Sequence, residues 1–202
     1  MFDNLFISIG RHIISFMYFL GGLSNQAFRT VALSVLPPYK KDRIFEQAKK
    51  AGLDSLPLVS LISLFIGFIF ALQTAYFMQR IGSELYIASL VALSIVRELG
   101  PVITALVVAG RVGASITAEI GSMQVTEQID ALETFATNPV KYLVVPRFIA
   151  LSLMLPILTL YADAIGILGS YLICVFRLGI SSSIYLRVTS EALFYKDLFN
   201  GL

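Results

Sequence analysis

The sequence is poor in charged residues and in the side chains that build metal and redox centres. Only 14% of its 202 residues are charged and 57% are hydrophobic, whereas a soluble domain carries about 25% charged residues. This apolar excess suits a surface that faces lipid. The single cysteine, Cys174, excludes an internal disulfide, and the only histidine, His12, cannot make a metal cluster. We expect Cys174 to be a small buried hydrophobe and His12 an interfacial side chain.

Charge and motif content exclude further classes of function. The chain has 15 Lys and Arg against 13 Asp and Glu, without the concentrated basic face of a nucleic-acid binder. The sequence contains no G-x-x-x-x-G-K-[ST] or G-x-G-x-x-G phosphate motif and no G-x-S-x-G nucleophile motif. We therefore expect no enzymatic activity, no catalytic residue, no metal and no cofactor in this chain. If ATP powers the protein, another chain hydrolyses it.

Residues 1–36 predict an amphipathic helix. Apolar residues recur at helical spacing, and the polar residues mostly take the other side. We expect this helix to lie in the membrane interface; a helix of the soluble type packed on the spans is the alternative. The apolar positions are interrupted by Arg11 and His12, and no convincing cleavage site follows. We expect no cleaved signal and a mature protein that begins near Met1.

A basic connector is predicted over residues 37–54. It opens with Pro37 and Pro38, which end the preceding pattern. Its basic residues are Lys40, Lys41, Arg43, Lys49 and Lys50. Because cytoplasmic flanks of spans are enriched in Lys and Arg, we expect this run and the N-terminus to face the cytoplasm.

Residues 55–80 predict the first transmembrane helix. No charge occurs before Arg80, and about 20 apolar residues suffice to cross the hydrocarbon core. Gly67, Ala71 and Ala75 recur every fourth residue, which would let another helix approach closely.

The second span, predicted over residues 85–116, carries polar residues in its middle. Arg97 and Glu98 stand directly before Gly100 and Pro101. Charges at membrane depth are kept where they face protein or a watery cavity, and Pro101 kinks the helix. A pair that neutralises itself is possible, but adjacent residues do not face each other on a helix. A polar cavity is therefore the favoured interpretation.

Residues 119–139 predict a short amphipathic helix on the cytoplasmic side. Acidic residues alternate there with apolar ones, and Asn138-Pro139 ends the segment. The residue pattern leaves two interpretations open. The helix docks on a partner, or it lies on the membrane face of its own protein.

Residues 142–177 predict a third span that is longer than the hydrocarbon core. We expect one bent helix, with two half-spans as the alternative. Gly166, Gly169 and Ser170 offer a close-packing face, and Asp163 either lines a pocket or emerges at the interface. Residues 178–202 predict an amphipathic segment on the outer side. The fold class is thus an all-α integral membrane protein.

Several runs of residues resemble the permease family of the MlaE/YrbE type. The resemblance is dense over about residues 95–150, and the hydropathy pattern agrees along the whole chain. The runs are Arg97-Glu98-Leu99-Gly100-Pro101-Val102, Ala109-Gly110-Arg111-Val112-Gly113-Ala114, Ala118-Glu119-Ile120-Gly121-Ser122-Met123, Val125-Thr126-Glu127-Gln128-Ile129-Asp130-Ala131-Leu132, Asn138-Pro139 and Val144-Val145-Pro146-Arg147.

The resemblance implies the permease of an ABC transporter that moves phospholipid between the bacterial inner and outer membranes, or a plastid counterpart. Its implied partners are a second copy of itself, an ABC ATPase that holds ATP and Mg²⁺, an MCE-domain lipid-binding protein and a STAS-domain subunit. The implied location is the bacterial inner membrane or the plastid inner envelope. Family members have five spans, of which this chain would hold the first three.

The resemblance also implies roles for individual residues. The segment from Glu119 to Leu132 resembles the helix that couples the permease to its ATPase. The coupling residues would be Glu119, Met123, Thr126, Glu127, Asp130 and Leu132. The lipid-pocket residues would be Gln73, Arg97 and Glu98, and the nearby apolar side chains of Leu72 and Phe77 are added to them on physical grounds. A head-group phosphate would favour Arg97, and the apolar residues would hold acyl tails.

Two other functions remain open. The chain could be a membrane anchor that recruits cytoplasmic partners, or a channel for small solutes, although the polar content of its spans is low for a channel. The direction of lipid movement does not follow from the sequence.

Overall fold

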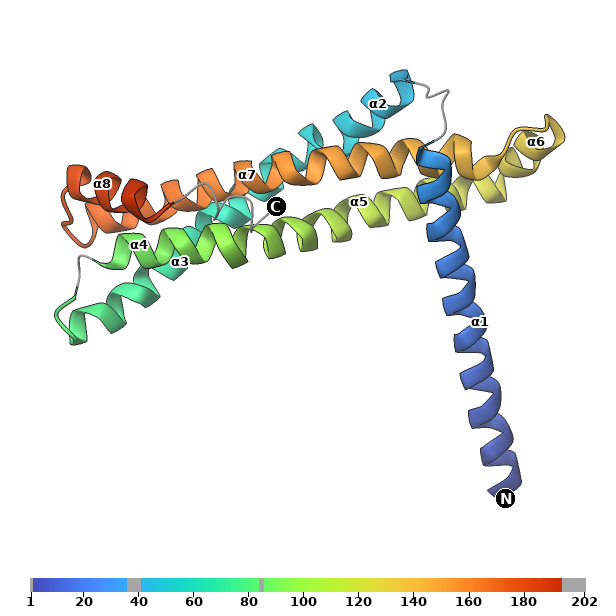
Figure 1. Cartoon of the computed structure of the whole chain (residues 1–202), viewed down its shortest axis with the longest axis horizontal. Helices are drawn as coiled ribbons and strands as arrows, with labels where there is room; N and C mark the ends of the chain where they lie inside the picture. The colour runs from blue at the N-terminus through green and yellow to red at the C-terminus, as the bar shows by residue number, and fades with distance from the viewer. Residues whose placement is uncertain (1, 36–40, 84–85, 194–202) are drawn as a thin grey trace.

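A computed structural model describes residues 2–35, 41–83 and 86–193, with side chains described from residue 10 onward. This part of the chain is helical and contains no strand. Three helical runs, Lys41–Arg80, Ile87–Val125 and Val140–Phe176, are long and apolar enough to cross a membrane. They lie alongside one another as an elongated bundle (Figure 1). The predicted all-α membrane class with three spans is confirmed.

The spanning runs are built from several helices each. The α-helices are α1 Phe2–Ser34, α2 Lys41–Ala51, α3 Leu56–Arg80, α4 Ile87–Ser94, α5 Gly100–Val125, α6 Gln128–Thr134, α7 Val145–Phe176 and α8 Ser182–Ala192. A 3₁₀ turn, Leu53–Ser55, joins α2 to α3. Two π turns, Ile95–Leu99 and Val140–Val144, precede α5 and α7. The basic connector therefore continues into the first span, where the sequence predicts a separate segment; residues 37–40 lie outside the described part.

Helix α1 points away from the bundle instead of lying along it, and it touches the bundle only at one end (Figure 1). It meets α7 near its own C-terminal end, where Thr30 is buried. Most of its described side chains are exposed, including Phe16 and Phe28. This arrangement disfavours a helix packed along the spans, and it is the one that an interfacial helix requires when the bundle stands along the membrane normal. The interfacial position itself stays a prediction.

Helices α3 and α7 cross in close backbone contact. A Cβ atom added to Gly67 would lie 2.1 Å from the carbonyl oxygen of Gly166, and one added to Gly169 would lie 2.5 Å from the carbonyl oxygen of Leu64. Ala71 and Ala75 are buried along the same face of α3. The small residues at four-residue spacing therefore lie where α7 approaches α3 closely, as predicted. A larger side chain there would separate the two backbones.

The segment between the second and third spans differs from the expected single helix over residues 119–139. Helix α5 continues to Val125, and only Gln128–Thr134 forms the separate helix α6. The break lies at Glu127, whose φ of 57° is in the left-handed region and cannot continue an α-helix. Residues 119–125 therefore belong to the spanning helix.

The third span is one helix. Helix α7 is continuous from Val145 to Phe176, with Pro156 inside it. Beyond α7, α8 folds back on α4 and α7, and Tyr185 is buried with its hydroxyl 2.5 Å from the Ser170 Oγ. Cys174 is fully buried in this cluster, as expected of a small hydrophobe. Residues 194–202 of the predicted outer segment lie outside the described part.

Candidate functional site

Arg97 and Glu98 lie in the π turn at the start of α5. Pro101 has no N–H to donate to the Arg97 carbonyl, and the N–H of Gly100 bonds instead to the carbonyl of Ile95. Both charged side chains are exposed on the surface of the chain. The exposed face continues along α5 through Val102, which is 56% exposed. A charged pair thus stands on an apolar face within the second span.

The other predicted lipid-pocket residues also lie on the outside of the chain. Leu72, Gln73 and Phe77 are exposed on α3. A pocket lined by these residues together with Arg97 and Glu98 therefore needs a second surface to close it. The pocket assignment remains a prediction.

Asp163 does not emerge from the bundle at the interface. Its side chain is buried in α7, and its carboxylate packs against Gly100, where an added Cβ would lie 1.7 Å from the Asp163 Oδ1. Within the described residues, that oxygen has no hydrogen-bond partner. The sequence left its place open, and the packing of α7 on α5 decides it.

The predicted coupling residues differ in their contacts and in their exposure. Glu119 faces its own chain, with Oε2 2.9 Å from the Arg147 Nη2, and Thr126 donates to the Ser122 carbonyl at 2.8 Å. Met123 and Leu132 are half-buried, whereas Glu127 and Asp130 are exposed. The docking assignment for all six stays a prediction; Glu127 and Asp130 are its fully exposed charges, whereas Glu119 is half-buried and paired with Arg147.

Two large apolar side chains flank α6 and point away from the fold. Val125 is 85% exposed and Phe135 is 80% exposed. Exposed apolar side chains beside acidic ones mark a surface that a partner can cover. This surface lies at the end of the bundle that we call the charged end, which is defined by Arg43, Lys50, Glu119, Lys141 and Arg147.

The charged end is held together by polar contacts between α2, α5 and α7. Besides the Glu119–Arg147 ion pair, the Lys50 Nζ lies 4.0 Å from the Glu119 Oε1. Arg111 on α5 donates to the Ser55 Oγ at 2.8 Å. Arg147 is not among the predicted site residues, although a charge just inside an apolar run is itself a signal of a functional or paired position.

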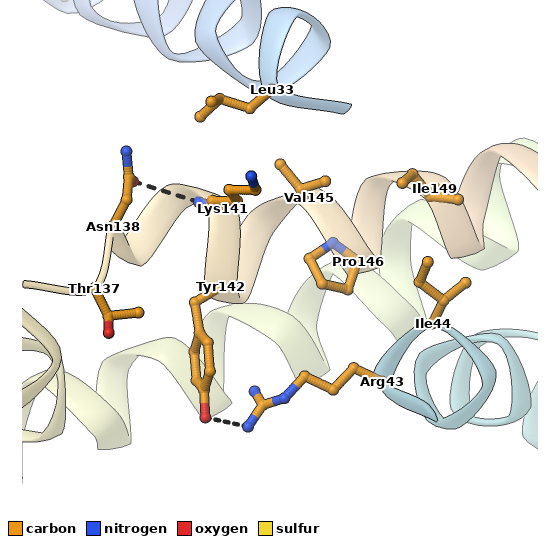
Figure 2. A pocket seen from close by; sticks show the side chains of 10 residues that line it. All are labelled: Leu33, Arg43, Ile44, Thr137, Asn138, Lys141, Tyr142, Val145, Pro146 and Ile149. Carbon is orange, nitrogen blue, oxygen red and sulfur yellow. Dashed lines mark hydrogen bonds between the residues drawn. The ribbon is translucent and has the colours of Figure 1, made fainter. Parts of the chain in front are cut away.

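A pocket of about 190 Å³ opens between the end of α1, α2 and the start of α7. Of its ten lining residues, five are apolar and five are polar or charged; Figure 2 shows them. The lining residues are Leu33, Arg43, Ile44, Thr137, Asn138, Lys141, Tyr142, Val145, Pro146 and Ile149. The Arg43 guanidinium donates to the Tyr142 hydroxyl and lies 3.7 Å from the centre of that ring. None of these residues belongs to a predicted site.

A second pocket of about 230 Å³ adjoins the first and shares Arg43, Tyr142 and Pro146 with it. Arg147 and Glu119 also line this second pocket. The Arg147 side chain is only 7% exposed, and its Nε and Nη1 atoms have no hydrogen-bond partner among the described residues. Neither pocket could be predicted from local sequence patterns, because each is assembled from segments that are distant in the chain.

Comparison with known proteins gives a consistent result. The family Permease MlaE matches residues 44–202. A probable ABC transporter permease protein of Rickettsia felis is 44% identical over 202 residues, which are 100% of this chain and 78% of the relative. The intermembrane phospholipid transport system permease protein MlaE of Haemophilus influenzae is 36% identical over 204 aligned residues, covering 100% of this chain and 77% of that protein.

A third relative comes from Synechocystis. A probable ABC transporter permease protein of Synechocystis is 41% identical over 154 residues, 76% of this chain and 59% of the relative. The family match covers more than half of the chain, and two of these relatives align along its whole length. With three apolar spanning helices in addition, this multi-pass membrane protein belongs to the MlaE permease family.

Proposed function

We propose that this chain is the permease subunit of an ABC transporter that moves phospholipid between two membranes, driven by ATP hydrolysis on a partner subunit. The observation that carries the proposal is the exposed Arg97–Glu98 pair within the second span. A charge in an apolar span is costly unless protein or water covers it. A phospholipid supplies both a phosphate for Arg97 and acyl chains for the surrounding apolar surface.

A second copy of the chain is the surface that would close this pocket. Gly110, Ala114 and Ala118 recur every fourth residue on the exposed face of α5, and a Cβ added to Gly110 would meet no atom within 4 Å. Small residues at this spacing allow another helix to approach closely. Val102 and Leu106 are exposed on α5 between these small residues and Glu98. Pairing along α5 would therefore place Arg97 and Glu98 near the boundary between the two copies.

The charged end would meet the ATPase. Helix α6 offers exposed acidic side chains between Val125 and Phe135. An interface of this kind buries apolar anchors and uses charge for orientation. The Glu119–Arg147 ion pair then connects the second span to the third, which gives movement at α6 a route into both spans. In the inner membrane of a bacterium, or the inner envelope of a plastid, this end would face the compartment that holds ATP.

Transport by the reconstituted transporter tests the lipid pocket. The complex is placed in vesicles with a fluorescent phospholipid, and lipid movement is followed after addition of MgATP. Arg97→Gln and Glu98→Gln should each lower the rate about tenfold, the effect of one lost charge-assisted contact, while the ATPase still co-purifies. Arg177→Gln, an exposed cation at the end of α7, is the matched control.

The alternatives give different results in the same assay. Unchanged lipid movement in both variants would show that Arg97 and Glu98 do not line the lipid pocket. Association with the ATPase without any ATP-dependent lipid movement by the unmodified complex would indicate an anchor. Ion or solute flux through the vesicles without ATP would indicate a channel.

A further inference from the structure

The pocket between the end of α1, α2 and the start of α7 has features that the proposed transport path does not use. It lies at the charged end, away from Arg97 and Glu98, which are not part of its lining. Leu33 reaches it from α1, on the opposite side from Arg43 and Tyr142 (Figure 2). Because α1 meets the bundle near here, whatever fills the pocket also contacts this junction.

The charge of the pocket is of one sign. Arg43 and Lys141 are its charged lining residues, and the described lining includes no Asp or Glu. Arg43 gives one of its donors to the Tyr142 hydroxyl, whereas a guanidinium has five. The Lys141 ammonium lies on the side of Leu33 (Figure 2). The pocket thus offers cationic donors and suits an anionic group.

The apolar part of the pocket continues onto the outside of α7. Ile149 lines the pocket, and Leu153 and Ile157 follow it at intervals of four residues, 59% and 57% exposed. Residues four apart lie on one face of a helix. An apolar chain that leaves the pocket past Ile149 would therefore lie along the exposed face of the third span.

The size of the pocket limits what it can enclose. A volume of about 190 Å³ is below the 300 Å³ or so of sites that enclose a whole small-molecule ligand. It accommodates a phosphate with part of a glycerol backbone, while the acyl chains would remain outside. Free phosphate would satisfy the cations but leave the apolar walls uncovered. An anionic amphiphile satisfies both.

We propose that this pocket binds the head group of an anionic phospholipid from the leaflet at the charged end, with its acyl chains along Ile149, Leu153 and Ile157. The site is distinct from the transport pocket and does not require that the bound lipid be transported. A lipid bound there would contact both α1, through Leu33, and the helices of the bundle. Failure of the transport proposal would leave it standing, because its evidence is the pocket alone.

The sequence contains no tryptophan, which makes a sharp binding assay possible. Leu33→Trp places one fluorescent reporter at the pocket, and the full chain is reconstituted into phosphatidylcholine vesicles with rising fractions of phosphatidylglycerol brominated on its acyl chains. Bromine quenches the reporter when the lipid is bound. Brominated phosphatidylcholine in phosphatidylcholine vesicles measures non-selective lipid contact.

Selective binding gives half-maximal quenching at a lower fraction of phosphatidylglycerol than of brominated phosphatidylcholine. Adding Lys141→Gln or Arg43→Gln to the reporter chain should raise the required phosphatidylglycerol fraction about fivefold each, the usual effect of one cation near an anionic lipid. Lys49→Gln, on α2 but outside the pocket lining, should change nothing. Arg43→Gln also removes the contact with Tyr142; Lys141→Gln keeps it and is the decisive variant.

Two results would overturn the proposal. Equal quenching by both brominated lipids, or quenching that Lys141→Gln leaves unchanged, would show that no anionic head group is bound. The remaining alternative is that the site binds free phosphate instead of a lipid head group. Adding inorganic phosphate, with chloride at equal ionic strength as the control, distinguishes the two. Phosphate should compete only weakly, because it leaves the apolar walls uncovered; if millimolar phosphate abolishes the preference for phosphatidylglycerol, the acyl contacts add nothing and the lipid assignment is wrong.

Discussion

The carboxylate of Glu119, near the end of α5, lies 2.9 Å from the guanidinium of Arg147, in the first turns of α7. The Arg147 side chain is 7% exposed, whereas that of Glu119 is 40% exposed. Lys50 on α2 approaches the same carboxylate at 4.0 Å. One carboxylate therefore links helices from all three spanning runs at the charged end. It is the recorded ion-pair partner of a buried arginine, which makes its removal costly.

Glu119→Gln should destabilise the fold by about 1–3 kcal/mol, because Arg147 would keep its buried charge without the carboxylate; the partial exposure of Glu119 keeps the loss below that of a fully buried pair. The apparent unfolding temperature in detergent measures this. Glu119→Gln combined with Arg147→Met should recover most of the loss. Glu46→Gln, which removes an exposed partner of Lys50, should cost less than about 1 kcal/mol. A double variant less stable than Glu119→Gln alone would contradict this account.

The contact between α3 and α7 predicts a sharp difference between two glycines. Gly67→Ala would place a Cβ 2.1 Å from a backbone oxygen of α7, and the helices must separate at a cost of about 1–3 kcal/mol. Gly121→Ala on α5 meets no atom within 4 Å and should be neutral or stabilising by up to about 1 kcal/mol, the helix-propensity gain. Unfolding in detergent at increasing temperature compares the two. Equal stability of both variants would show that the crossing is looser than the structure has it.

Gly100 and Asp163 should be energetically coupled. Gly100→Ala alone would push a methyl group into the Asp163 carboxylate and should destabilise the fold by about 1–3 kcal/mol. In the background of Asp163→Ala the space is vacated, and the same change should cost little. A double-mutant cycle on stability in detergent should give an interaction energy of at least about 1 kcal/mol. Additive effects would mean that the two residues are not in contact.

The parts of this architecture that sequence reasoning reached are local in the chain. The absence of charge from residue 55 to Arg80 identifies a span, and the spacing of Gly67, Ala71 and Ala75 identifies its contact face. Helical periodicity and hydropathy depend only on neighbouring residues. The same local information located Arg97 and Glu98 in the second span, because charges in an apolar run are conspicuous.

The features that could not be predicted from the sequence depend on packing between segments that are distant in the chain. Glu119 and Arg147 are paired because α5 and α7 lie side by side at the charged end, and no local pattern states that register. The pocket at Arg43 and Lys141 forms only because the end of α1 meets the bundle there and contributes Leu33. Glu119 resembled a docking residue in the sequence, yet the structure gives it a partner within its own chain.

Reversing charge on α6 should weaken binding of the ATPase subunit. Glu127→Lys combined with Asp130→Lys changes two exposed carboxylates, and we expect at least a tenfold weaker affinity, since charge at an interface rim acts on association. Affinity is measured with the purified ATPase and the chain in nanodiscs. Glu191→Lys on α8, at the other end of the bundle, is the control. Undiminished binding of the double variant would place the ATPase elsewhere.

Pairing of two copies should depend on the exposed small residues of α5. Gly110→Leu adds a side chain into space that is open in the single chain, so the fold of each copy should survive. Between two closely approaching helices the same side chain would keep the backbones apart, and we expect at least a tenfold loss of self-association. Counting subunits by stepwise photobleaching in nanodiscs measures this, with Ala164→Leu, an exposed small residue of α7, as the matched control. Dimers that persist with Gly110→Leu would mean that another face joins the copies, and the pocket at Arg97 and Glu98 would then need a different second wall.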